Sequence, residues 1–131
     1  MTYAVGMSTM RMAVVGAGSW GTTVASLAAE NTPTTLWARR GDVADEVNKS
    51  HRNSTYLKET ALSGNLRAST SLEVTVGTAD VVVMAVPSHG FREVLSEAAP
   101  HIRPWVPVVS LSDRKSTRLN SSHLVISYAV F

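Results

Sequence analysis

A glycine pattern suited to phosphate binding follows the first apolar run of the chain. Residues 16–21 are Gly-Ala-Gly-Ser-Trp-Gly, a G-x-G-x-x-G spacing between an expected strand and an Ala-rich segment of helical character. In this setting Gly16 permits the tight turn out of the strand, Gly18 lets the backbone approach a pyrophosphate, and Gly21 lets the helix pack against the sheet. The start of such a helix offers free N–H groups and a partial positive charge to phosphates. The pattern predicts a dinucleotide site, with a tight turn that binds nothing as the alternative.

Two arginines at the end of the second expected strand are the next chemically informative residues. The segment runs Leu-Trp-Ala-Arg39-Arg40, and no carboxylate appears before Asp42. Sites selective for NAD place an acid here to bond the ribose hydroxyls, whereas NADP sites place arginine beside the 2′-phosphate. Arginine forms charge-assisted, often bidentate hydrogen bonds with phosphate. The pair favours NADPH as cofactor, alone or together with NADH. The alternative is that both side chains are solvent-exposed charges at the start of the next helix.

The loop after the fourth expected strand carries Pro87 and His89. Ligands of such sheets bind at the carboxyl ends of the strands, so Pro87 is expected to fix this loop beside the cofactor. His89 has the chemistry of a general base, but a loop histidine beside glycine is more typical of an exposed residue. Trp20, at the mouth of the glycine turn, is a candidate cover for the cofactor. The sequence shows no Ser-His-Asp order, metal-ligand cluster or carboxylate pair, so it predicts no catalytic residue and no metal site.

Alternating strands and helices are expected to position these residues. Short β-rich runs alternate with segments of helical spacing, and the continuous apolar run 81–86 is typical of a strand buried on both faces. Ser71 is the expected N-cap of a short helix. This order predicts an α/β fold of Rossmann type, a doubly wound parallel sheet with helices on both faces. The expected strands are 11–15, 34–37, 81–86 and 106–111, with loop and a short strand within 56–68, and the longer helices are 21–31, 42–49 and 91–99.

Composition and charge narrow the class of protein. The chain has 131 residues, 44% of them apolar, which fits one folded domain or a piece of a larger protein. It has no cysteine, which excludes disulfide and thiolate metal sites. No run approaches the roughly 20 apolar residues of a membrane span, and no secretion signal is visible, so a cytoplasmic location is expected. Of 12 basic and 10 acidic side chains, three basic and one acidic lie after residue 112. The body of the chain is therefore neutral, which predicts no nucleic-acid partner.

Several motifs together resemble one enzyme family. Gly-Ala-Gly-Ser-Trp-Gly-Thr at 16–22, Leu-Trp-Ala-Arg-Arg at 36–40, Asn48 with Asn53, and Val-Met-Ala-Val-Pro at 83–87 follow the order of bacterial NAD(P)-dependent glycerol-3-phosphate dehydrogenase. The resemblance implies reversible hydride transfer between glycerol 3-phosphate and dihydroxyacetone phosphate, feeding glycerophospholipid synthesis, in a homodimeric full-length enzyme. The family's Tyr-Leu-Pro-Gly is Tyr-Leu-Lys-Glu here, at 56–59. The residues whose positions contact NADPH in the family are Ser19, Trp20, Arg39, Arg40 and Tyr56.

The end of the chain departs from this family. After Ser-Leu-Ser at 110–112 the family continues with Lys-Gly and then with an all-helical substrate domain that carries the catalytic lysine, whereas this chain has Asp113-Arg114. Residues 113–131 resemble one translated frame of a sequencing-library adapter. This predicts a non-native tail after a dinucleotide-binding domain of residues 1–112, with cofactor binding but no turnover. The alternative is a natural basic tail that ends in an apolar segment. The last run, 124–131, is β-prone and has no expected partner strand.

Two other functions stay open at this point. A related reductase, of hydroxyacid or ketopantoate type, would share the Rossmann glycine motif, although Gly-Ser-Trp-Gly and the order of the later motifs favour the first family. A non-catalytic nucleotide-sensing module would need a DNA-binding or effector segment, and the neutral body offers none.

Overall fold

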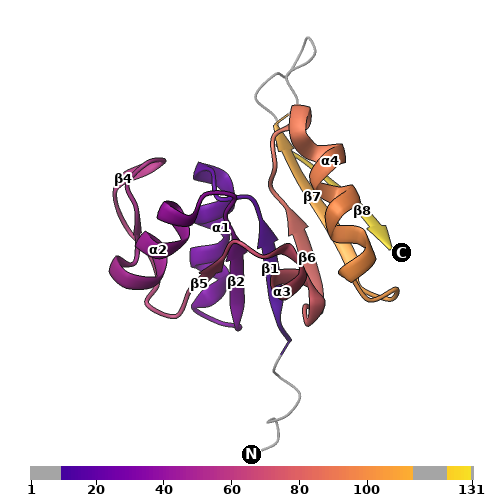
Figure 1. Ribbon diagram of the computed structural model, residues 1–131, viewed down its shortest axis with the longest axis horizontal. Helices are drawn as coiled ribbons and strands as arrows, with labels where there is room; N and C mark the ends of the chain where they lie inside the picture. The colour runs from indigo at the N-terminus through magenta and orange to yellow at the C-terminus, as the bar shows by residue number, and fades with distance from the viewer. Residues whose placement is uncertain (1–9, 114–123, 131) are drawn as a thin grey trace, which may run out of the picture.

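A six-stranded sheet forms the centre of the molecule (Figure 1). The computed structural model describes residues 10–113 and 124–130. The strand order is β5-β2-β1-β6-β7-β8, in which the first five strands run parallel and β8 is antiparallel to β7. The predicted doubly wound parallel sheet is confirmed. The strand bounds are β1 Met12–Val15, β2 Thr34–Trp37, β5 Arg67–Ser69, β6 Val81–Met84, β7 Pro107–Asp113 and β8 Leu124–Val130.

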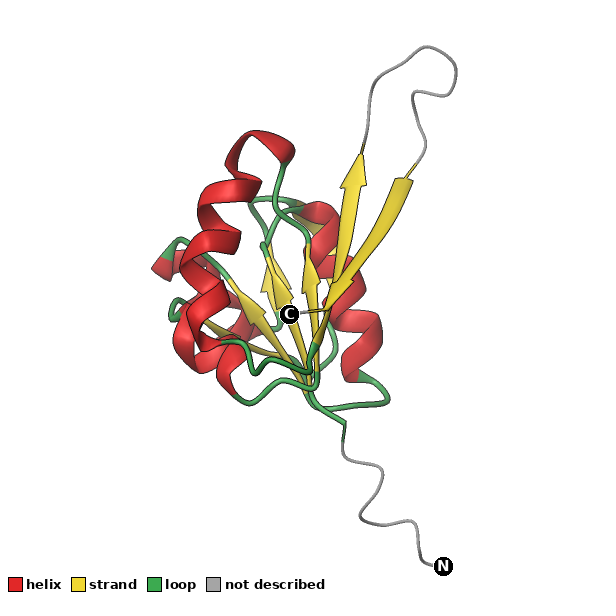
Figure 2. Ribbon diagram, turned by 90° about the vertical axis from the view of Figure 1, so that its right-hand side faces the viewer, coloured by secondary structure: helices red, strands yellow, loops and turns green. Residues whose placement is uncertain are grey.

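Helices cover both faces of this sheet (Figure 2). Side chains alternate across a strand, so β1 sends Ala13 and Val15 into one core and Val14 into the other. The first core is closed by α3 and α4, and the second by α1 and α2. The helix bounds are α1 Ser19–Ala29, α2 Gly41–Ser50, α3 Leu72–Gly77 and α4 Ser88–Ala98, and a short 3-10 helix, Ala99–His101, follows α4.

The expected elements are present, with shifted ends. Helix α1 begins at Ser19, inside the glycine motif, and α4 begins at Ser88, three residues before the expected start. The predicted N-cap is confirmed, because the Ser71 hydroxyl accepts a hydrogen bond of 3.2 Å from the Val74 amide. Among the described residues, no helix has the length and apolarity that a membrane crossing requires.

A small antiparallel hairpin was not expected. It consists of β3 (Arg52–Asn53) and β4 (Leu57–Ala61). The sequence predicts loop and one short strand within 56–68, and that strand corresponds to β5. The chain enters the hairpin through His51, which ends α2 in the left-handed conformation with φ of 56°. The His51 carbonyl then accepts a hydrogen bond of 2.9 Å from the Leu62 amide. Backbone pairing, and not a hydrophobic alternation, therefore defines this element.

The last strand also corrects an expectation. The run 124–131 had no expected partner, but β8 pairs with β7 along its length, from Pro107 opposite Val130 to Asp113 opposite Leu124. The outermost strand of a parallel sheet presents a row of unpaired N–H and C=O groups, which a β-prone segment can satisfy. Strand β7 itself extends to Asp113, past the expected end at residue 111.

Candidate functional site

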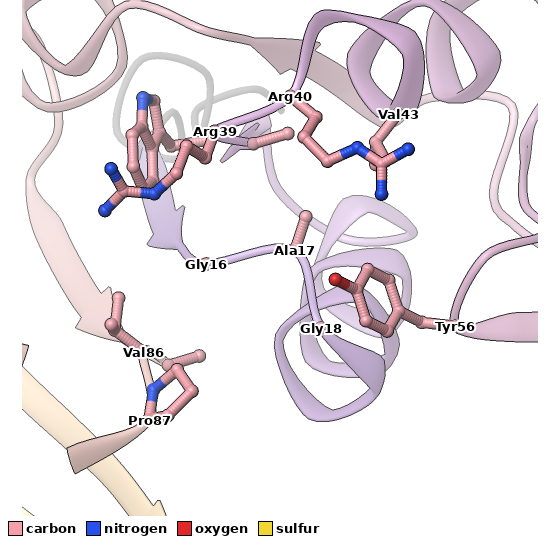
Figure 3. Close-up of a pocket in the computed structure, with 12 residues that line it drawn as sticks. Gly16, Ala17, Gly18, Arg39, Arg40, Val43, Tyr56, Val86 and Pro87 are labelled. Carbon is pink, nitrogen blue, oxygen red and sulfur yellow. The ribbon is translucent and has the colours of Figure 1, made fainter. Parts of the chain in front are cut away.

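An open pocket of about 260 Å³ lies at the carboxyl end of three central strands (Figure 3). Its walls come from the segments that follow β1, β2 and β6, from α2, and from the turn between β3 and β4. In parallel α/β sheets this edge is where ligands bind. The lining residues are Gly16, Ala17, Gly18, Trp37, Ala38, Arg39, Arg40, Val43, Tyr56, Ala85, Val86 and Pro87.

The three glycines of the motif have different surroundings. Gly16 has φ of +122°, and a Cβ there would meet the Ala85 carbonyl oxygen at 2.7 Å. A Cβ on Gly21 would lie 1.9 Å from the carbonyl oxygen of Gly16. A Cβ on Gly18 would meet no atom within 4 Å. Gly16 and Gly21 therefore serve the packing of the turn, and Gly18 leaves open space on the pocket side.

The start of α1 is free to bind an anion. Gly18 is its N-cap residue, no side chain caps the helix, and its first turn carries no acidic residue. The first amide groups of a helix have no intrahelical acceptor, and the helix dipole favours negative charge at this end. The open face of Gly18 and the uncapped helix start together fit the pyrophosphate of a dinucleotide.

A buried asparagine holds the glycine turn in place. Asn53, on β3, is fully buried, and its Nδ2 donates to the Ala17 carbonyl oxygen at 3.0 Å and to Thr22 Oγ1 at 2.9 Å. Its Oδ1 is buried and has no partner among the described residues. The hairpin thus connects directly to the loop that forms the floor of the pocket.

The two arginines leave the end of β2 in opposite directions (Figure 3). The Arg39 guanidinium lies over the indole of Trp37, with its carbon 5.4 Å from the ring centre. The Arg40 guanidinium pairs with the Asp42 carboxylate, with Nε–Oδ1 and Nη2–Oδ2 distances of 3.1 and 2.6 Å. The hydrogen bond from Arg40 lowers the pKa of Asp42, and the same bond raises the pKa of Arg40.

The structure brings six of the nine residues proposed for cofactor binding to the pocket wall. They are Gly16, Gly18, Arg39, Arg40, Tyr56 and Pro87. Tyr56 is half-exposed, and its ring points from the turn between β3 and β4 toward the glycine turn (Figure 3). Ser19, Trp20 and Gly21 lie in the first turn of α1 outside this lining, and the Trp20 side chain is 52% exposed.

The remaining lining residues are ones that sequence reasoning did not propose. Most are small or apolar residues, whose pattern does not distinguish a pocket wall from a core: Ala17, Ala38, Val43, Ala85 and Val86. Trp37 is buried, its Nε1 donates to the Thr70 carbonyl oxygen at 3.0 Å, and its side chain also lines the pocket. His89 is exposed on α4 and does not line the pocket. Within the described ranges, no group of acidic or histidine side chains is arranged to hold a metal ion.

Comparison with known proteins decides the family. The family model for the N-terminus of NAD-dependent glycerol-3-phosphate dehydrogenase matches residues 11–126. The chain belongs to this family. The glycerol-3-phosphate dehydrogenase [NAD(P)+] of Mycobacterium avium is 52% identical over 118 residues, which cover 88% of this chain and 35% of that protein.

Solved structures of the family have the same architecture. The glycerol-3-phosphate dehydrogenase of Coxiella burnetii superposes with a TM-score of 0.73 and 28% identity, over 80% of this chain and 33% of that one. The enzyme of Saccharomyces cerevisiae gives a TM-score of 0.75 and 25% identity, over 81% and 34%. The chain thus spans about a third of the length of its relatives and corresponds to the N-terminal, NAD-binding domain of glycerol-3-phosphate dehydrogenase. The resemblance inferred from the motifs is confirmed.

Proposed function

We propose that this chain holds NADPH or NADH in the pocket at the carboxyl ends of β1, β2 and β6. The observation that carries the proposal is the open face of Gly18 beside an uncapped helix start, with two arginines on the neighbouring wall. The dinucleotide-binding domain comprises residues 1–112, and residues 113–131 take no part in the site. The pocket-lining residues all lie at or before Pro87, which agrees with this division.

The proposed contacts follow the chemistry of each wall. The turn of Gly16, Gly18 and Gly21 and the first residues of α1, Ser19 and Trp20, face the pyrophosphate. Arg39 and Arg40 face the adenosine ribose and its 2′-phosphate, because guanidinium groups bind phosphate through paired hydrogen bonds. Tyr56 and Pro87 form opposite sides of the pocket (Figure 3).

For the whole protein we propose reversible hydride transfer between glycerol 3-phosphate and dihydroxyacetone phosphate, in the supply of glycerophospholipids. The described residues would orient the cofactor, and a second domain would bind the substrate and provide the catalytic lysine. The bound dinucleotide supplies the hydride chemistry, and the protein supplies position and electrostatics. We further propose a cytoplasmic homodimer for the complete enzyme.

Equilibrium binding tests the proposal. Titration of the 131-residue chain with NADPH and with NADH, followed by quenching of tryptophan fluorescence, should give saturable binding. AMP should compete at higher concentration, and dihydroxyacetone phosphate should cause no NADPH oxidation. Failure of both dinucleotides to bind the folded chain would overturn the cofactor assignment. If a full-length protein carrying this domain reduced ketopantoate in preference to dihydroxyacetone phosphate, the proposed substrate would be wrong.

A further inference from the structure

Arg40, which lines the pocket where the adenosine end of a dinucleotide is expected, forms an ion pair with Asp42. Arg40 is the N-cap residue of α2, and Asp42 lies in the first turn of the same helix. Nε and Nη2 of Arg40 donate to the two carboxylate oxygens of Asp42 at 3.1 and 2.6 Å. Both side chains are more than half exposed, at 56% and 63%. The pair is therefore accessible to a ligand that enters the pocket.

The local structure favours this pair. A negative charge in the first turn of a helix interacts favourably with the helix dipole, so Asp42 is stabilised as a carboxylate. The two-residue spacing lets the guanidinium fold back over the start of α2 and present one of its paired-donor edges to both oxygens. The lowered pKa of Asp42 agrees with this geometry, and the hydrogen bond from Arg40 is its main cause.

The pair makes the two arginines of the pocket unequal. The Asp42 carboxylate occupies one paired-donor edge of Arg40 and offsets its charge. Arg39 stacks on Trp37 instead, and no carboxylate among the described residues lies within ion-pair distance of it. The pocket wall therefore presents one unshared guanidinium, that of Arg39, and one that already holds an anion, that of Arg40.

We propose that Asp42 determines the selectivity between NADPH and NADH by competing with the 2′-phosphate for Arg40. The inference rests on the proposed dinucleotide site. NADH carries a ribose hydroxyl where NADPH carries the phosphate, so the ion pair stays intact beside NADH. The phosphate of NADPH has to share Arg40 with a carboxylate of like charge, which lowers its affinity. Asp42 thus reduces the preference for NADPH that two arginines alone would give.

The test compares two neutralised aspartates on one helix. Asp42→Asn keeps the size of the side chain and removes its charge, and Asp45→Asn makes the same change at an exposed position of α2 outside the pocket lining. Kd values for NADPH, NADH and the fragment 2′,5′-ADP are measured on the 131-residue chain. Asp42→Asn should lower the Kd of NADPH and of 2′,5′-ADP about 5-fold, because the carboxylate of an exposed ion pair no longer competes with the 2′-phosphate for Arg40. The Kd of NADH should change less than about 2-fold, and Asp45→Asn should leave all three values near wild type.

A double-variant cycle separates competition from a general charge effect. In an Arg40→Gln background, Asp42→Asn should no longer tighten NADPH binding, because the guanidinium for which the two anions compete is gone. The inference is overturned if Asp42→Asn leaves NADPH binding unchanged or weakens it, if Asp45→Asn has the same effect, or if the gain persists without Arg40. Failure of the wild-type chain to bind either dinucleotide would instead contradict the proposed function. This outcome is distinguishable from the three outcomes that overturn the role of Asp42.

Discussion

Gly18 and Gly21 occupy one turn and have opposite surroundings. A methyl group at Gly21 would overlap the Gly16 carbonyl oxygen, at 1.9 Å, whereas one at Gly18 would enter open space. We expect Gly21→Ala to lower the free energy of unfolding by about 2 kcal/mol, because overpacking against backbone outweighs the gain in helix propensity. Gly18→Ala should cost less than about 1 kcal/mol of stability, the loss of a good N-cap residue, but weaken NADPH binding about tenfold. Urea unfolding and NADPH titration of both variants measure the two effects.

The difference between the two variants in stability and in NADPH affinity tests the roles assigned to Gly18 and Gly21. If Gly18→Ala kept wild-type affinity for NADPH, the pyrophosphate would not approach this face of the turn. If Gly21→Ala were as stable as wild type, helix α1 would have to shift away from β1 to accommodate the methyl group.

Asn53 connects the hairpin to the glycine turn, and its removal should affect both stability and binding. Asn53→Ala deletes the hydrogen bonds to Ala17 and Thr22 inside a fully buried site and should cost about 2 kcal/mol of unfolding free energy. The freed turn should also bind NADPH more weakly. Asn48→Ala is the matched control, because Asn48 makes two hydrogen bonds with the Ala68 backbone at an exposed position away from the pocket. Asn48→Ala should lower the free energy of unfolding by less than about 1 kcal/mol and leave the Kd of NADPH unchanged. Equal effects of the two variants on this Kd would contradict the role of Asn53 in positioning the glycine turn.

At the level of single residues, motif chemistry predicted part of the site. The spacing of the glycines predicted Gly16 and Gly18, and the end of the second strand predicted Arg39 and Arg40. These residues are predictable because glycine permits a tight turn and a close backbone approach, and because arginine binds phosphate through paired hydrogen bonds. The apolar wall residues, such as Val43 and Val86, did not follow, since burial against a ligand and burial in a core require the same side chains. The pairing of Arg40 with Asp42 depends on how a side chain folds back at a helix start, which composition does not determine.

At the level of elements, Asp80 joins the starts of the central strands. Its Oδ2 accepts a hydrogen bond of 2.8 Å from the Arg11 amide, just before β1, and its Oδ1 accepts one of 3.1 Å from Arg103 Nη2. The bond from the Arg11 amide is the main cause of the lowered pKa of Asp80. Because the folded-state pKa lies below the usual 3.8, the carboxylate stabilises the fold above that pH, and this contribution is lost as the pH falls through the lower folded-state value.

Asp80→Asn should therefore reduce stability at neutral pH and lose its effect in acid. Urea midpoints of wild type and variant, measured from pH 7 to pH 3, should differ most at the upper end and converge below the usual pKa of an aspartate. Asp45→Asn, whose side chain is exposed on α2, should follow the wild-type profile. A difference that is constant with pH would mean that the charge of Asp80 plays no part.

Helices and central strands were predictable because their signals are local. The run 81–86 and the helical spacing of 42–49 identify buried faces directly, and the structure has β6 and α2 there. The hairpin was not predictable, since Leu57–Ala61 carries polar residues in succession and is held by backbone pairing with β3. Helix α1 starts earlier than expected because Ser19 and Trp20, within the glycine motif, already belong to its first turn.

At the level of the whole molecule, the site and the last strand lie in separate parts of the sheet. The pocket uses β1, β2 and β6, whereas β8 pairs only with the outer edge of β7. A variant that ends at Ser112 should therefore bind NADPH with a Kd within about 2-fold of the full chain. It should also associate more readily, because the edge of β7 loses its partner strand and exposes unpaired backbone groups. Fluorescence titration gives the affinity, light scattering gives the association state, and far-UV circular dichroism shows that both proteins are folded. If the shortened, folded chain lost NADPH binding, residues 113–131 would contribute to the site and the division at residue 112 would be wrong.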